Sequence, residues 1–234
     1  MAVVQVRSAP LPRHVAFQVR GMSEYARDVG VSVGESFARG SVGLKDAALA
    51  LFRLNVPVVT FGLLPQGYAG KDRAEVMDAL TVFFEGLSSW PVLRDLQVKV
   101  TVLGKWYDLP GALVENVKRV LEETRDFDRF FLNICVEYDG QEEIVDACRL
   151  VARQVKAGKL DVDAIDRQVI KENIYASYFP PPEIIVKTGK RRSLQGLLLW
   201  DSALSDVVFV DKPFPSLSRE DVFRAIADWQ QRAG

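Results

Sequence analysis

The chain has 234 residues, 48% of them apolar, which is enough to bury one large core. Lys and Arg number 30 against 31 Asp and Glu, so the formal net charge of -1 predicts no general attraction to nucleic acid or to an anionic membrane. Any site for a phosphorylated ligand must therefore be local.

The cysteine and histidine content excludes a zinc cluster. Cys135 and Cys148 form no CxxC pair, and the single histidine, His14, cannot complete a metal site with them. Two cysteines without such a pair predict that the protein is located in a reducing compartment, the cytoplasm. The chain does not start with a basic segment followed by an apolar run, and no apolar run approaches the roughly 20 residues of a membrane-spanning helix. We therefore expect a soluble protein that is at most peripheral to a membrane.

Short apolar runs alternate along the chain with longer segments of helical period, a pattern typical of a mainly parallel sheet covered by helices. The predicted strands are, in chain order, His14 to Val19, Val56 to Leu63, Leu96 to Leu103, Arg129 to Glu137, Glu183 to Lys187 and Asp206 to Val210. No linker, repeat or low-complexity tract divides the chain. We predict a single α/β domain over residues 1–234, with a central sheet flanked by helices.

Four segments between and after these strands have the apolar spacing of amphipathic helices. The first two bury Leu44, Ala47, Ala48, Leu51 and Phe52, and then Val76, Leu80, Phe83, Phe84 and Leu87. A third helix follows Asp139 and is predicted to turn Ile144, Ala147, Cys148 and Val151 inward. The last begins at Ser218, an N-cap residue with Asp221 three positions on.

Three blocks in the second half of the chain are more specific than this pattern. They read LNICVEYDGQEEIVDA at 132–147, FPPPEIIVKTG at 179–189 and LLLWDSALSDVVFV at 197–210. With HVA at 14–16 and the terminal RAG at 232–234, they follow the order and spacing of the cis-prenyltransferases, the family of undecaprenyl diphosphate synthase. The chain resembles this family over nearly its whole length.

The resemblance implies a parallel-sheet α/β fold that dimerises and an activity that condenses isopentenyl diphosphate onto an allylic diphosphate. In that reaction diphosphate leaves the allylic carbon, helped by magnesium and cationic hydrogen-bond donors, and the alkene of isopentenyl diphosphate attacks. Such a site needs a carboxylate for Mg²⁺ and several groups that bind phosphate oxygens.

The chain departs from the family at most of those positions. Arg20 stands where the family holds its metal-binding Asp, and Glu24 stands at a phosphate-binding Arg. Val33 and Phe37 replace an Arg and a His. The loop LPQGYA at 64–69 retains none of the family's FSTENW residues. The resemblance therefore predicts that no catalytic group is intact in the chain's own pocket.

Some charged residues remain near the family's isopentenyl diphosphate site. Lys187 replaces one Arg, and Arg191 and Arg192 flank the position of another, so these three are candidates for diphosphate binding. With Lys190, the two arginines form a basic run. Two interpretations of this run are kept: a solvated loop, or a segment that contacts phosphate or a membrane surface. Asp206 aligns with a late metal-binding Glu, and is a candidate metal ligand or, alternatively, a turn or cap residue.

Our first hypothesis is a non-catalytic subunit of a heteromeric cis-prenyltransferase that makes long-chain polyprenyl diphosphate, similar to the Nogo-B receptor-type subunits. The resemblance implies that Arg232 and Gly234, of the terminal RxG, complete the active site of a catalytic homologue in a heterodimer or heterotetramer. Isopentenyl and allylic diphosphates would bind through that complex. Mg²⁺ would then be held by the partner and not by this chain alone. A homodimer of this chain is a further alternative for the assembly.

Two alternatives stay open beside this hypothesis. A repurposed prenyl transferase or terpene cyclase would need a new carboxylate cluster, for which Glu24, Asp28 and Glu35 are candidates. A prenyl-lipid-binding protein would use an apolar pocket without chemistry, and the apolar Val33 and Phe37 fit that function.

Overall fold

The structure is a computed structural model that describes residue 6 and residues 10–65, 70–193 and 196–233. One sheet holds all strands of this part of the chain, in the order β3-β4-β2-β1-β5-β6, and every pairing is parallel. The strands are β1 (His14–Gln18), β2 (Val58–Pro65), β3 (Val98–Leu103), β4 (Phe130–Tyr138), β5 (Ile184–Thr188) and β6 (Asp206–Val210). The predicted strands and the α/β fold class are confirmed, with strand ends displaced by no more than two residues.

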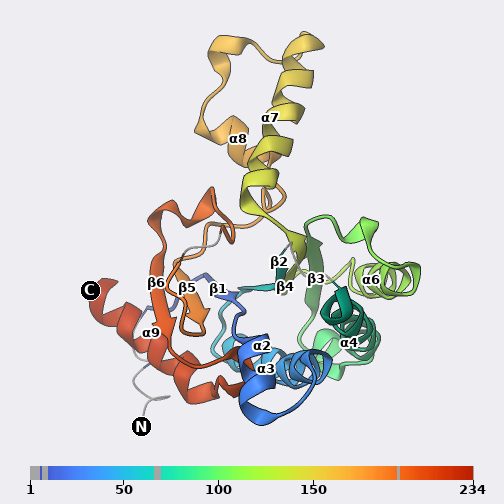
Figure 1. Cartoon of the computed structure of the whole chain (residues 1–234). Helices are drawn as coiled ribbons and strands as arrows, with labels where there is room; N and C mark the ends of the chain where they lie inside the picture. The colour runs from blue at the N-terminus through green and yellow to red at the C-terminus, as the bar shows by residue number, and fades with distance from the viewer. Residues whose placement is uncertain (1–5, 7–9, 66–69, 194–195, 234) are drawn as a thin grey trace.

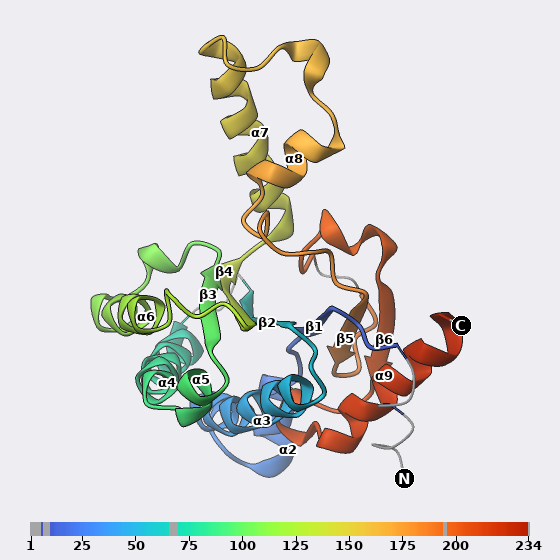
Figure 2. The ribbon, with the colours of Figure 1, turned by 180° about the vertical axis from the view of Figure 1, so that it is seen from behind.

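The helices are divided unequally between the two faces of the sheet. Those of the described residues are α2 (Met22–Val29), α3 (Val33–Arg53), α4 (Gly70–Ser88), α5 (Pro91–Asp95), α6 (Gly111–Glu123), α7 (Gly140–Lys156), α8 (Arg167–Asn173) and α9 (Arg219–Ala233). Helices α3, α4, α6 and α9 surround one side of the sheet, whereas α7 and α8 project away from the opposite side as a hairpin (Figures 1 and 2).

The main core lies between the sheet and the helices α3, α4 and α9. Alternate residues of β1 enter it, with Phe17 stacked on Phe61 at 4.8 Å between ring centres and Phe61 meeting Phe214 edge-on at 6.0 Å. The inward residues predicted for the first two helices are all buried here. This side of the sheet is therefore filled by large aromatic and aliphatic side chains.

The other sheet face carries a hydrogen-bonded row of buried polar groups. The Nδ1 of His14 donates to the carbonyl of Pro180 at 2.7 Å, and its Nε2 accepts from the Thr60 hydroxyl at 2.7 Å. Asn133 Nδ2 donates to the same hydroxyl at 3.2 Å. Burial lowers the pKa of His14 to about 4, so the ring is neutral. His14 is thus a structural residue of the sheet.

Helix α7 differs from its prediction at one position. Asp139 caps it as predicted, since its carboxylate accepts from the main-chain N–H groups of Gln141 and Glu142. Ala147 is buried, but Cys148 is exposed, so the prediction that it turns inward is wrong. The cause is the projection of α7 beyond the sheet, which leaves only a narrow stripe of the helix covered.

The start of α9 follows the predicted capping pattern. The Ser218 hydroxyl accepts from the main-chain N–H of Asp221 at 3.2 Å, and the Asp221 carboxylate accepts from the main-chain N–H of Ser218 at 3.0 Å. Burial favours the protonated carboxyl, but hydrogen bonds from Lys212 and Ser218 outweigh it and lower the pKa of Asp221. The last helix is therefore anchored next to the end of β6.

Candidate functional site

The loops that follow β1, β5 and β6 meet at the carboxyl edge of the sheet. The main-chain N–H of Arg20 donates to the Thr188 hydroxyl at 2.9 Å, and the Arg20 carbonyl accepts from Phe214 at 2.9 Å. Gly189 donates its main-chain N–H to the Lys212 carbonyl at 2.7 Å. We call this set of loops, residues 19–21, 189–193 and 211–214, the carboxyl rim.

Glycine is required where the rim turns. Gly21 has φ 86°, in the left-handed region, and a Cβ at this position would lie 2.7 Å from the Cα of Pro213. Gly189 has φ 83° and approaches Arg20 and Gly21 closely. These two residues allow the loops after β1 and β5 to pack main chain against main chain, and they fix the place of Arg20.

Lys187 lies on β5 beside Gln18 of β1 and is 1% exposed. Its Nζ donates to the main-chain carbonyl of Ser193, which belongs to the rim. Burial, together with the positive charge of Arg20, lowers the pKa of Lys187 to about 8. Since Gln18 pairs in register with Lys187 and the main chain of Arg20 is bound to Thr188, the two cations lie near the ends of adjacent strands.

The basic run after β5 is held by carboxylates of the same chain. Lys190 Nζ lies 2.8 Å from the Glu24 carboxylate, and Arg192 Nη2 donates to both oxygens of Asp211 at 2.8 and 2.7 Å. The Arg192 guanidinium also lies 5.1 Å from the ring centre of Phe209. Arg191 is exposed, with no ion-pair partner among the residues that the structure describes.

The groups at the position of Arg20 do not fit a magnesium ion. Mg²⁺ binds through carboxylate and other oxygen ligands, whereas Arg20 and Lys187 bring positive charge to this place. The carboxylates of Glu24 and Asp211 lie nearby but are each within hydrogen-bond distance of a cation. Within the described ranges, no three His, Cys, Asp or Glu residues are grouped as metal ligands.

Asp206 and Arg232 lie away from the rim, near the amino end of β6. Asp206 begins that strand and pairs in register with Ile184, the first residue of β5, so it is at the opposite end of the sheet from Arg20. Arg232, in the last turn of α9, places Nη1 4.0 Å from the Asp206 carboxylate. Gly234 lies outside the described residues.

The residues of the two alternative functions are dispersed. Glu35 forms an ion pair with Arg39 at 2.6 Å and Glu24 is bound to Lys190, and within the described residues these acids are not grouped as metal ligands. Asp28 is exposed at the end of α2. Phe37 is buried in the main core at 1% exposure, so it is a core residue and not part of an exposed apolar surface.

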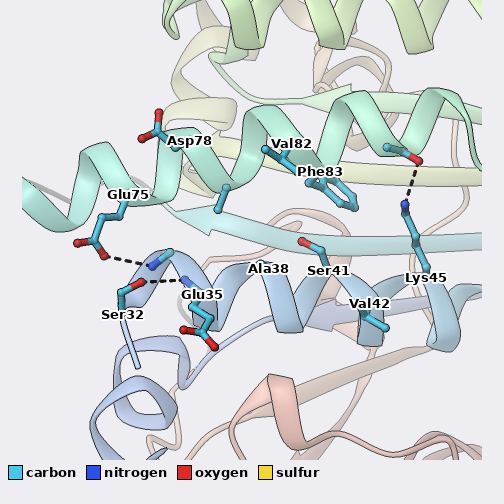
Figure 3. Close-up of a pocket in the computed structure, with 13 residues that line it drawn as sticks. Ser32, Glu35, Ala38, Ser41, Val42, Lys45, Glu75, Asp78, Val82 and Phe83 are labelled. Atoms are coloured by element: carbon cyan, nitrogen blue, oxygen red, sulfur yellow. Dashed lines mark hydrogen bonds between the residues drawn. The ribbon is translucent and has the colours of Figure 1, made fainter. Parts of the chain in front are cut away.

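A hollow of about 560 Å³ lies elsewhere, between α3 and α4 (Figure 3). Its walls are mainly apolar: Val42 and Val82 are 63% and 66% exposed, and Phe83 lies beside them. Polar groups stand at its ends, with Glu75 hydrogen-bonded to the main chain of Gly34 at 3.3 Å. We call this hollow the α3–α4 groove. No sequence motif predicted it.

Asp211 was not identified from the sequence as a site residue, although a signal for it exists. It directly follows β6, and the ends of neighbouring parallel strands meet at one edge, so it could have been placed beside the loop after β5. The pairing of Glu24 with Lys190 has no comparable signal, because it joins segments that are 166 positions apart.

A parallel sheet whose carboxyl edge gathers cations and glycine turns is typical of proteins that bind phosphorylated ligands. The family model described as "Putative undecaprenyl diphosphate synthase" matches residues 19–234, and the chain belongs to this family of prenyltransferases.

Curated relatives from archaea agree with this assignment. The chain is 31% identical over 231 residues to the tritrans,polycis-undecaprenyl-diphosphate synthase (geranylgeranyl-diphosphate specific) of Methanopyrus kandleri, covering 97% of this chain and 85% of the relative. The protein of the same name from Thermoplasma volcanium is 31% identical over 233 residues, covering 97% and 90%.

The fold also matches a solved structure. Lavandulyl diphosphate synthase from Lavandula x intermedia, crystallised with dimethylallyl diphosphate, superposes with a TM-score of 0.89 over 94% of this chain and 95% of that chain. Because the two are 21% identical, this likeness concerns the fold. No helix of the described ranges combines the length and the apolar character needed to cross a bilayer.

Proposed function

We propose that this chain is the non-catalytic subunit of a heteromeric cis-prenyltransferase that makes long-chain polyprenyl diphosphate from isopentenyl diphosphate. The observation that carries the proposal is Arg20, which follows β1 and is bound through its main chain to Thr188 next to Lys187, at the position where the resemblance places the metal-binding carboxylate. Departure of diphosphate with metal assistance needs a negative ligand there. A catalytic homologue is the partner, and it holds the Mg²⁺.

The position of Arg232 supports a role outside the chain's own pocket. It lies beside β6, which is at the edge of the sheet and, within the described residues, pairs only with β5. The residues Val207, Val208 and Phe209 of this edge are partly exposed and line a hollow with Arg232. An apolar edge strand is a ready surface for another chain. A partner docked along β6 would meet Arg232, whose planar guanidinium suits a diphosphate.

The names of the curated relatives support a proposal for the substrate class. Their names are those of synthases specific for geranylgeranyl diphosphate, so we assign to the complex an allylic diphosphate of that class and isopentenyl diphosphate. The condensation takes place at the partner's metal, and this chain contributes its C-terminal Arg232 and Gly234 to the partner's site.

The test is an assay of isopentenyl diphosphate incorporation with three preparations: this chain, its catalytic homologue from the same source, and the co-purified pair. We expect activity only from the pair or strongly enhanced activity in it. Replacement Arg232→Ala in this chain alone is expected to lower the rate of the pair by about 10²-fold, the usual cost of one lost charge-stabilising group.

Arg224→Ala is the matched control, because Arg224 is an exposed arginine of the same helix and pairs only locally with Glu220 at 3.0 Å. It should leave the rate of the pair within about twofold, as expected for a surface ion pair. Incorporation by this chain alone would contradict the proposal and would favour a repurposed prenyltransferase. Equal effects of the two arginine variants on the rate of the pair would contradict the proposal that Arg232 contributes to the partner's site.

The α3–α4 groove favours a second candidate function, the binding of a prenyl lipid without chemistry. Its exposed Val42 and Val82 offer an apolar lining to an isoprenoid chain. A fluorescent geranylgeranyl analogue is expected to bind the isolated chain, and Val42→Lys is expected to weaken that binding at least tenfold because a charge then enters the lining. If the Val42→Lys variant binds the analogue as tightly as the unmodified chain, the α3–α4 groove is not the binding site.

A further inference from the structure

The carboxyl rim has cations that suit an anion site, but carboxylates of the same chain already bind two of them, Lys190 and Arg192. At Arg192, both oxygens of Asp211 accept from one nitrogen of the guanidinium. The Phe209 ring, 5.1 Å away, holds the guanidinium from another side. A guanidinium binds carboxylates and phosphates through the same N–H donors. The Asp211 carboxylate therefore occupies donors of Arg192 that could otherwise bind a phosphate.

Glu24 occupies a second cation of the rim. It lies in the first turn of α2, where the helix dipole favours an anion, and its carboxylate is 2.8 Å from Lys190 Nζ. Glu24 is 22% exposed, whereas Lys190 is 76% exposed, so the carboxylate is the fixed member of the pair. The place at the helix start that would suit a phosphate thus carries a negative side chain.

Lys187, which lies on β5 directly before the rim, is satisfied by the main chain. Lys187 Nζ donates to the carbonyl of Ser193, and the lysine is almost fully buried. The segment from Gly189 to Ser193 therefore closes over Lys187 while its own Lys190 and Arg192 contact Glu24 and Asp211. Three cations from one strand and the loop after it are each bound within the chain.

We propose that Glu24 and Asp211 act as internal counter-anions, which occupy Lys190 and Arg192 of the carboxyl rim and so weaken the binding of diphosphate in this chain's own pocket. Diphosphate must displace both carboxylates from their cations and remain near their negative charges, and both effects weaken its binding. The inference rests on the proposed function in one respect: a subunit that binds diphosphate weakly leaves the substrate to its partner. Its test does not need the partner.

The test measures binding of inorganic diphosphate to the purified whole chain by isothermal titration calorimetry at low ionic strength. The variant Glu24→Gln with Asp211→Asn keeps the side-chain shapes and releases Lys190 and Arg192. It is expected to bind diphosphate about tenfold more tightly than the unmodified chain, since each surface ion pair contributes modestly. Glu115→Gln is the matched control, because it removes a carboxylate paired with Lys118 at 2.9 Å on α6, on another part of the sheet.

A further variant separates a true rim site from a general charge effect. Adding Arg192→Gln to the double variant should abolish most of the gain. Asp211→Asn alone, at an exposed position, provides a smaller gain of two- to threefold and serves if the double variant is unfolded. A double variant that binds no better than Glu115→Gln overturns the inference, as does a gain that survives Arg192→Gln. Either result concerns the rim only, because dependence on the partner is measured separately in the incorporation assay.

Discussion

The polar groups on the second sheet face and those of the carboxyl rim are held in different ways. His14 and Thr60 are buried at 1% or less, and their partners are groups fixed within the fold. Asp211 and Arg192 are 61% and 56% exposed, and water competes for both. Buried hydrogen bonds are costly to break, whereas exposed ion pairs contribute little. The interior polar groups therefore define the fold, while the rim charges can exchange partners without unfolding it.

The rim nevertheless has a fixed shape, because its main chain is bound independently of its charges. Hydrogen bonds join Arg20 to Phe214 and Gly189 to Lys212, and Gly21 lies against Pro213. Charge changes at the rim should thus alter binding, and main-chain changes should alter stability. Four experiments test this difference between the two regions.

Two effects of similar size are expected to be the largest, and the first is that of Gly21→Ala. A Cβ here meets the Cα of Pro213 at 2.7 Å on a residue with φ 86°, so strain and overpacking together should lower the free energy of unfolding by about 3 kcal/mol. Urea unfolding measures it. Gly30→Ala is the control, because Gly30 has φ 75° with open space around its Cβ, and it should cost about 1 kcal/mol. Equal losses would show that the contact with Pro213 is not tight.

Acidification tests the interior face through His14, the single histidine. Its folded pKa of about 4 lies below its ordinary value of 6.5, so the unfolded chain takes up the proton first as pH falls. Its contribution to stability is complete above pH 6.5 and is lost between 6.5 and 4, by about 3 kcal/mol. NMR titration of the ring should give a pKa near 4, and the stability gap between the unmodified chain and His14→Gln should narrow over this range. An ordinary pKa would contradict the buried network.

Thr60→Val removes the hydroxyl that joins His14 to Asn133 and keeps a similar volume. It leaves two buried nitrogen groups without their partner and should destabilise the fold by about 2 kcal/mol. Thr81→Val is the control, since the Thr81 hydroxyl bonds only the carbonyl of Met77 one helical turn back. Chemical denaturation of both variants measures the difference, and a loss no larger than that of the control would show that water replaces the hydroxyl.

The smallest stability effect is expected for Asp211→Asn at the rim. The contact of both Asp211 oxygens with one Arg192 nitrogen is exposed to solvent, so its loss should change the free energy of unfolding by less than about 1 kcal/mol. A change as large as that of Thr60→Val would abolish the distinction between the two regions, because the rim charges would then be part of what holds the fold.

Much of the fold was predictable because apolar periodicity reports burial directly. Alternation in β1 places Val15 and Phe17 in the main core, and the sequence shows that pattern. Cys148 was misplaced because periodicity indicates which helix face is apolar and does not indicate whether another element covers it. Helix α7 projects past the sheet, and this is a property of the whole fold.

The candidate site was predictable only in part. Arg20 and Lys187 were identified because they stand where the resembled family has a metal-binding Asp and an Arg, and they lie near the ends of adjacent strands. The partners of the basic run were not predictable, because surface charges have no periodic constraint and can pair with any acid within reach. The separation of Asp206 from Arg20 depends on which end of β6 it occupies, which the structure gives through the register with β5.

The projecting hairpin of α7 and α8 offers a way to detect the association of this chain with a partner. Its outer part packs helix against helix, with Gln154 bonded to Asn173 at 2.9 Å, and it exposes Val145, Leu150 and Val162. Local opening should therefore require less free energy there than in β2 and β4, and its amide protons should exchange with deuterium sooner. A partner that covers these side chains would slow that exchange, so mass-spectrometric exchange over residues 145–170 reports association without any turnover of substrate.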